Sequence, residues 1–99
     1  MVINIQKFIS STYNIPINML KGKINVKNSE QYKLYNVCIL MSWLLHPTKK
    51  YGCKSTIARL HSSNMNRVYR LNSLYQNNTK FKSFVDNVIK DYKRNYASD

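Results

Sequence analysis

The chain has 99 residues, of which 43% are hydrophobic, so it has room for one folded domain and is not a disordered segment. Sixteen lysines and arginines against four acids give a formal net charge of +12. Such a charge favours a polyanionic partner and excludes a surface on which both signs are evenly mixed.

The first third of the chain predicts two helices and a basic loop. Apolar residues at helical spacing predict a helix over residues 4–13, with a break before Pro16. Pro16 suits the first turn of a very short second helix that runs through Leu20. Residues 21–28 then form a basic loop, in which Gly22 allows a tight turn.

The third predicted helix is the most apolar. It begins at a cap formed by Asn28 or Ser29, and Gln31 stands at the spacing of a capping box. It runs to about His46, where Pro47 stops it. Its second half has little polar face, so we expect this helix to be the central, nearly all-round buried element.

Two short helices separated by a polar turn follow. Ser55 or Thr56 can cap a helix that runs through about Leu60. Residues 61–63 separate it from a helix over residues 64–76. This layout is that of a helix-turn-helix.

A last helix, capped by Thr79, completes the chain, and residues 96–99 are expected to be a frayed tail after a domain of residues 1–95. We therefore predict an all-α fold: a single small domain of about six helices with a helix-turn-helix and no sheet. Six aromatic side chains are assigned to the core rather than to a base-stacking surface: Tyr13, Tyr32, Tyr35, Trp43, Phe81 and Phe84.

Cysteines, histidines and acids give no sign of catalysis or metal binding. Cys38 and Cys53 make no disulfide framework, which fits a reducing, cytoplasmic compartment. With His46 and His61 they form no CxxC or HxxxH pair, and the acids are scattered, so we expect no metal, no cofactor and no enzyme activity. The sequence has no signal-like N-terminus and no apolar run that could span a bilayer, so we expect neither secretion nor a membrane span.

Candidate DNA contacts lie in three polar regions. On the fifth predicted helix, polar residues spaced i, i+3, i+4 and i+7 make one continuous face opposite the apolar stripe, and its Arg and Asn side chains suit guanine and adenine edges. The basic loop suits phosphate or the minor groove, and a helix N-terminus suits phosphate. The candidates are Lys21, Lys23 and Lys27 in the loop; Lys49, Lys50, Lys54, Ser55 and Thr56 before and in the fourth helix; and Ser63, Asn64, Asn66, Arg67 and Arg70 around the fifth.

The N-terminal residues carry a family resemblance. Residues 4–7 (Asn-Ile-Gln-Lys), Tyr13 and Ile15, and Leu20 before a basic loop and a long apolar helix, are similar to the C-terminal DNA-binding domain of the bacterial replication initiator DnaA. The resemblance covers residues 3–94. It implies a wholly helical fold with a helix-turn-helix that recognises a short duplex site.

The resemblance weakens towards the recognition helix. Asn25 stands in the basic loop where the family has an arginine that enters the minor groove. The family's Ile-Gly matches Ile57-Ala58, and its Asp-His-Thr-Thr-Val falls on residues 64–68, where Val68 alone matches. The resemblance therefore implies the fold and general duplex binding, and not recognition of the usual DnaA box.

Two functions of different classes follow. The first is a nucleoid-associated protein that binds double-stranded DNA in replication initiation or its regulation, with the recognition helix in the major groove and the basic loop on the backbone or minor groove. The alternative is a protein-interaction module derived from a degraded helix-turn-helix, with Met65 and Tyr69 among its contacts. Nucleic acid is the commonest polyanion and an anionic membrane surface is another, but we expect no membrane partner. The sequence identifies no protein partner or oligomeric state.

Overall fold

The computed structural model describes residues 2–46 and 53–96. Those residues form six helices and no strand, which confirms the all-α prediction: α1 (Val2–Tyr13), α2 (Ile17–Leu20), α3 (Ser29–Leu44), α4 (Cys53–Leu60), α5 (Met65–Asn77) and α6 (Thr79–Tyr96). None of them is long and apolar enough to cross a membrane. Tyr96 belongs to α6 and not to a tail, and residues 97–99 lie outside the described part of the chain.

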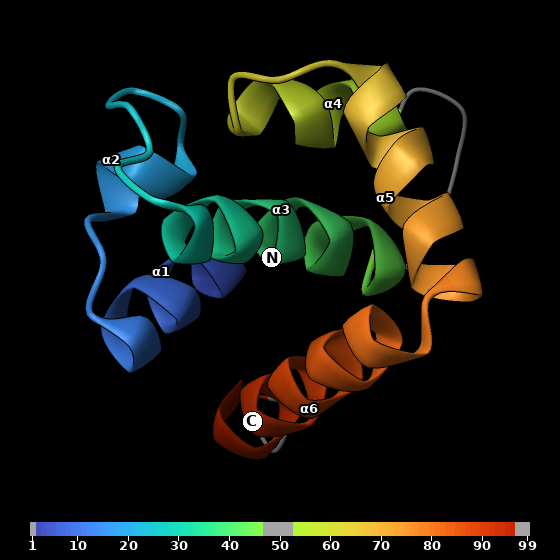
Figure 1. Cartoon of the computed structure of the whole chain (residues 1–99). Helices are drawn as coiled ribbons and strands as arrows, with labels where there is room; N and C mark the ends of the chain where they lie inside the picture. Colours follow the sequence, from blue (N-terminus) through green and yellow to red (C-terminus); the bar gives the residue numbers. More distant parts are fainter. Residues whose placement is uncertain (1, 47–52, 97–99) are drawn as a thin grey trace.

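Helix α3 lies at the centre of the molecule, with α1, α4, α5 and α6 arranged around it (Figure 1). Every residue from Leu34 to Trp43 except Asn36 is buried. A helix that is apolar on all sides needs neighbours on all sides, so the sequence of this segment sets the arrangement of the others. The predicted central position of this helix is confirmed.

The start of α3 is capped as the sequence predicts. The Asn28 side chain accepts a hydrogen bond from the Gln31 backbone N–H at 2.9 Å. The Gln31 side chain accepts one from the Lys27 N–H at 2.9 Å, one residue earlier than in a capping box. Helix α3 ends at Leu44, two residues before the predicted end at His46.

The predicted cap of α6 at Thr79 is wrong. Asn78 adopts an extended backbone, and its side chain accepts a hydrogen bond from the Phe81 N–H at 3.0 Å. Asparagine is a stronger N-cap than threonine, so the residue before Thr79 takes the role and Thr79 becomes the first helical residue.

Not every residue of the predicted apolar stripes is buried. Tyr35 and Trp43 are in the core, and the other aromatics assigned to it are half-buried, except that Tyr32 is 48% exposed. Leu60, three residues after the buried Ile57, is 46% exposed, and Ile57 and Ala58 are the buried residues of α4. Helical spacing gives the existence of an apolar stripe but not the width that its neighbours cover.

The end of α4 is tied to α3 by a buried polar cluster. His61 is fully buried, and its Nδ1 lies 2.9 Å from the carbonyl oxygen of Ile57, which can only accept a hydrogen bond. Nδ1 therefore carries the proton, and Nε2 accepts from the Cys38 thiol at 3.4 Å. The Tyr35 hydroxyl donates to the His61 carbonyl. His61 thus packs in the core, and its burial lowers its pKa.

This burial predicts a pH-dependent stability. The unfolded chain takes up a proton on His61 near the ordinary histidine pKa of about 6.5, whereas the folded chain does so only at lower pH. The free energy of unfolding should therefore fall as pH falls from about 6.5 towards the lowered pKa, and urea unfolding at several pH values should show it. The variant His61→Gln should lose the part of this pH dependence that His61 contributes. An NMR titration in which the His61 imidazole protonates at or above pH 6.5 would contradict the account.

Candidate nucleic-acid interface

The basic loop between α2 and α3 is fixed against the turn between α4 and α5. Gly22 has a φ of +75°, and a Cβ atom on it would lie 2.5 Å from the His61 carbonyl oxygen. The Ser62 hydroxyl donates a hydrogen bond to the Lys21 carbonyl at 2.8 Å. Glycine is therefore required both for the backbone conformation and for the close approach. Two segments that are distant in sequence form one surface.

The turn itself is built from backbone hydrogen bonds that end α4. Ser62 adopts a left-handed φ of +54°, and the Ser63 N–H donates to the Ala58 carbonyl at 2.8 Å. Asn64 then caps α5, because its side chain accepts a hydrogen bond from the Arg67 N–H at 3.1 Å. Helix α5 begins at Met65, one residue later than predicted, and Asn64 is a cap. The predicted helix-turn-helix is formed by α4, this turn and α5.

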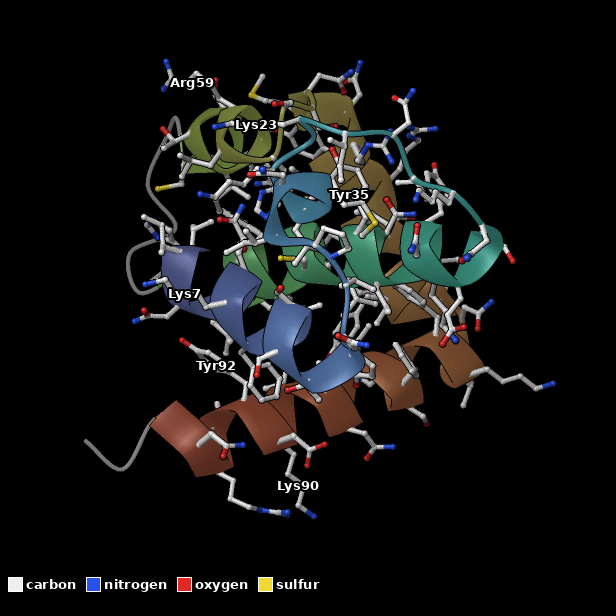
Figure 2. All side chains as sticks on the ribbon, turned by 90° about the vertical axis from the view of Figure 1, so that its left-hand side faces the viewer. Lys7, Lys23, Tyr35, Arg59, Lys90 and Tyr92 are labelled. Carbon is white, nitrogen blue, oxygen red and sulfur yellow. The ribbon has the colours of Figure 1, made fainter. Side chains whose placement is uncertain are left out.

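The basic loop, α4 and α5 contain cations and no acid. Within residues 21–27 and 53–77 there are seven, and they are Lys21, Lys23, Lys27, Lys54, Arg59, Arg67 and Arg70. The acids of the described chain lie elsewhere: Glu30 at the start of α3, and Asp86 and Asp91 on α6. Figure 2 places Lys23 and Arg59 at one end of the molecule and Lys90 at the other. Positive charge with no acid nearby creates a positive electrostatic potential over the surface that carries it.

The predicted continuous polar face of α5 is wrong, because Arg67 turns towards α3. Its Nε donates to the Ser63 hydroxyl at 2.7 Å, and its Nη1 donates to Asn36 Oδ1 at 2.8 Å and to the Tyr32 hydroxyl at 3.1 Å. Arg67 and Ser63 are half-buried, whereas Asn66 and Arg70 are exposed. The pattern of four polar residues is therefore divided between two half-buried and two exposed positions.

Lys54, predicted to contact phosphate, is held by aromatic rings. Its Nζ lies 3.7 Å from the centroid of the Trp43 ring and 4.8 Å from that of Tyr69. An ammonium group between two ring faces is attracted by both of them. Lys54 is half-buried and joins the end of α3 and the start of α4 to α5.

The remaining predicted residues divide between exposed and undescribed positions. Ser55 and Thr56 are exposed within α4, which begins at Cys53, so neither caps that helix as predicted. Lys23 and Lys27 are exposed and Lys21 is half-buried. Lys49 and Lys50 lie outside the described residues.

Sequence reasoning missed Arg59 as a surface feature, and it named Tyr69 only as a contact of the protein-interaction alternative. Arg59 is exposed and lines an open hollow between α4 and α5, together with Ser55, Ser62, Ser63, Asn64, Met65 and Asn66. Tyr69 is 55% exposed on the outer side of α5. A signal for Arg59 was present, because it stands four residues after Ser55 and two after the inward Ile57, which puts both polar residues on the outer face of α4.

Comparison of the chain with protein-family models, with curated proteins and with solved structures finds no significant match. The residues of this surface are therefore the basis for proposing a function.

Replacing Gly22 tests the attachment of the basic loop. Gly22→Ala should cost about 2 kcal/mol or more in the free energy of unfolding, because a left-handed residue with a Cβ costs about 1–2 kcal/mol and the contact with the His61 carbonyl adds to it. The neighbouring Lys23→Ala, at an exposed position, should stay within about 0.5 kcal/mol of the wild type. Urea unfolding that gives both variants equal stability would contradict the attachment.

Proposed function

We propose that the protein binds double-stranded DNA with the surface formed by the basic loop, α4 and α5, and that α5 enters the major groove. The observation that carries this proposal is the attachment of the basic loop to the turn between α4 and α5. It joins segments that together contain seven cations and no acid. A duplex presents closely spaced phosphates on both sides of a groove, and an acid-free basic surface matches that pattern.

The exposed side chains supply both kinds of contact that a duplex reader needs. Asn66 lies in the first turn of α5, the part of a recognition helix that meets base edges, and Arg70 follows one turn later. Amide and guanidinium groups pair with adenine and guanine edges. Lys23, Lys27 and Arg59 are exposed and suit backbone phosphates, which give affinity without sequence preference.

The resemblance to the DnaA C-terminal domain supports the same docking. It favours α5 in the major groove and the basic loop on the backbone or the minor groove of the adjacent turn. It also favours a role in replication initiation or its regulation on the nucleoid. The loop has lysines and Asn25 where the family has an inserted arginine, so phosphate contact is the form of loop binding that we propose.

The alternative is a protein partner on the same surface. Leu60, Met65 and Tyr69 are exposed on α4 and α5, and apolar side chains of this kind are common contacts in protein interfaces. A protein contact through these residues would depend little on salt, whereas a duplex contact through lysine and arginine depends strongly on it.

Salt dependence is the first test. The binding constant for a duplex should fall linearly on a double-logarithmic plot against salt concentration, with a slope of about −0.9 for each phosphate contact. Contacts from Lys23, Lys27 and Arg59 alone give a slope of about −2.7. Fluorescence anisotropy with a labelled duplex measures it. A chain that binds no duplex at low salt, or binds it without regard to salt, does not have the proposed function.

Single alanine variants locate the surface. Lys23→Ala and Arg59→Ala should each weaken binding to every duplex and reduce the salt slope by about 0.9, because each removes one phosphate contact. Lys90→Ala is the matched control, since Lys90 is an exposed lysine at the opposite end of the molecule. Equal losses for all three variants would show that net charge, and not this surface, drives binding.

A further inference from the structure

Within the described part of the chain, Arg67 is the residue of α5 whose guanidinium hydrogen-bonds to the first half of α3. Three acceptors receive its N–H groups: Ser63 at 2.7 Å, Asn36 at 2.8 Å and Tyr32 at 3.1 Å. Its Cζ also lies 5.4 Å from the centroid of the Tyr35 ring. To reach a base edge, this side chain would have to give up these contacts.

We propose that Arg67 is a positioning residue that sets the DNA sequence preference of α5 without touching a base, through its contacts with Tyr32 and Asn36 on α3. The inference rests on the proposed duplex binding and assigns the reading to other residues. These are the outer face of α5, which consists of Asn66, Tyr69, Arg70 and Ser73. All four are exposed and spaced i, i+3, i+4 and i+7, so they form one side of the helix.

The partners on α3 are arranged to receive this side chain. Tyr32 and Asn36 are one helical turn apart, so their polar atoms lie on the same side of α3. Asn36 is the one residue from Leu34 to Trp43 that is not buried, and its side-chain oxygen accepts from Arg67. The hydrogen bond from Arg67 also lowers the pKa of Tyr32.

The chemistry of arginine explains why this contact would fix the rotation of α5 as well as its distance from α3. The guanidinium is a planar fork whose donors have fixed directions, so simultaneous bonds to Ser63 in the turn and to Tyr32 and Asn36 on α3 restrict the rotation of α5. Lysine keeps the charge but presents a compact ammonium that cannot hold three acceptors in that plane. Bases are discriminated by bidentate contacts that depend on the orientation of the reading face. A rotation of α5 should therefore reduce the discrimination between base sequences, while the attraction of the basic side chains to phosphates persists.

The test compares a duplex selected from a random pool by the wild-type protein with a scrambled duplex of the same length. Affinities for both are measured over a range of salt concentrations. The variants are Arg67→Lys, the α3 double variant Tyr32→Phe/Asn36→Ala, and the triple variant that combines them. Asn66→Ala is the matched reading-face control, and circular dichroism confirms that each variant keeps its helices.

Arg67→Lys should reduce the ratio of selected to scrambled affinity by about tenfold, with the salt slope unchanged, because no phosphate contact is lost. The α3 double variant should give the same reduction, although its residues lie on another helix. The triple variant should reduce the affinity ratio no further than Arg67→Lys or the α3 double variant does, since each of them removes the same contact between Arg67 and α3.

Additive losses in the triple variant would overturn the inference, as would an α3 double variant with wild-type discrimination. A reduced salt slope in Arg67→Lys would overturn it too, because a direct contact would then have been changed. These outcomes leave the proposed function standing if the wild type still binds duplex. A wild type that binds neither duplex overturns the proposed function and this inference together.

Discussion

The buried turn after α4 is the feature on which the functional surface depends. His61 fills a fully enclosed position, its ring pairs with the Ile57 carbonyl and the Cys38 thiol, and its own carbonyl receives the Tyr35 hydroxyl. The same carbonyl stands so close to Gly22 that only a residue without a side chain fits there. One turn therefore fixes α4 to the central helix and the basic loop to α4. An unsatisfied polar group in this place would be costly, so the arrangement has little freedom to change.

This architecture concentrates charge that the fold could otherwise have spread. Lys23 of the loop and Arg59 of α4 lie at one end of the molecule, whereas the acids of the described chain are at the start of α3 and on α6. Two of the cations are also used within the structure. Lys54 lies over two aromatic rings and Arg67 bonds to α3, so both stabilise the position of α5 and contribute to the positive field. Structure and electrostatics are coupled in these two residues.

The sequence predicts the fold well because its strongest signals are local. A segment that is apolar on all sides can only be central, and the asparagine at the start of α3 caps it in any environment. The site is predicted less well, because a polar residue opposite an apolar stripe can face water or a polar pair on another helix. Arg67 takes the second course, since Asn36 interrupts the buried face of α3 beside it. No spacing within α5 contains that information.

The measurement that tests the central claim most directly is an NMR titration of the labelled protein with a short duplex at low salt. The account predicts that the backbone amide signals which move most belong to residues 21–27 and to α4 and α5, because these form the acid-free surface. Signals of α6, which carries five cations together with Asp86 and Asp91, should move little. Shifts concentrated on α6, or shifts absent from the loop and from α5, would contradict it.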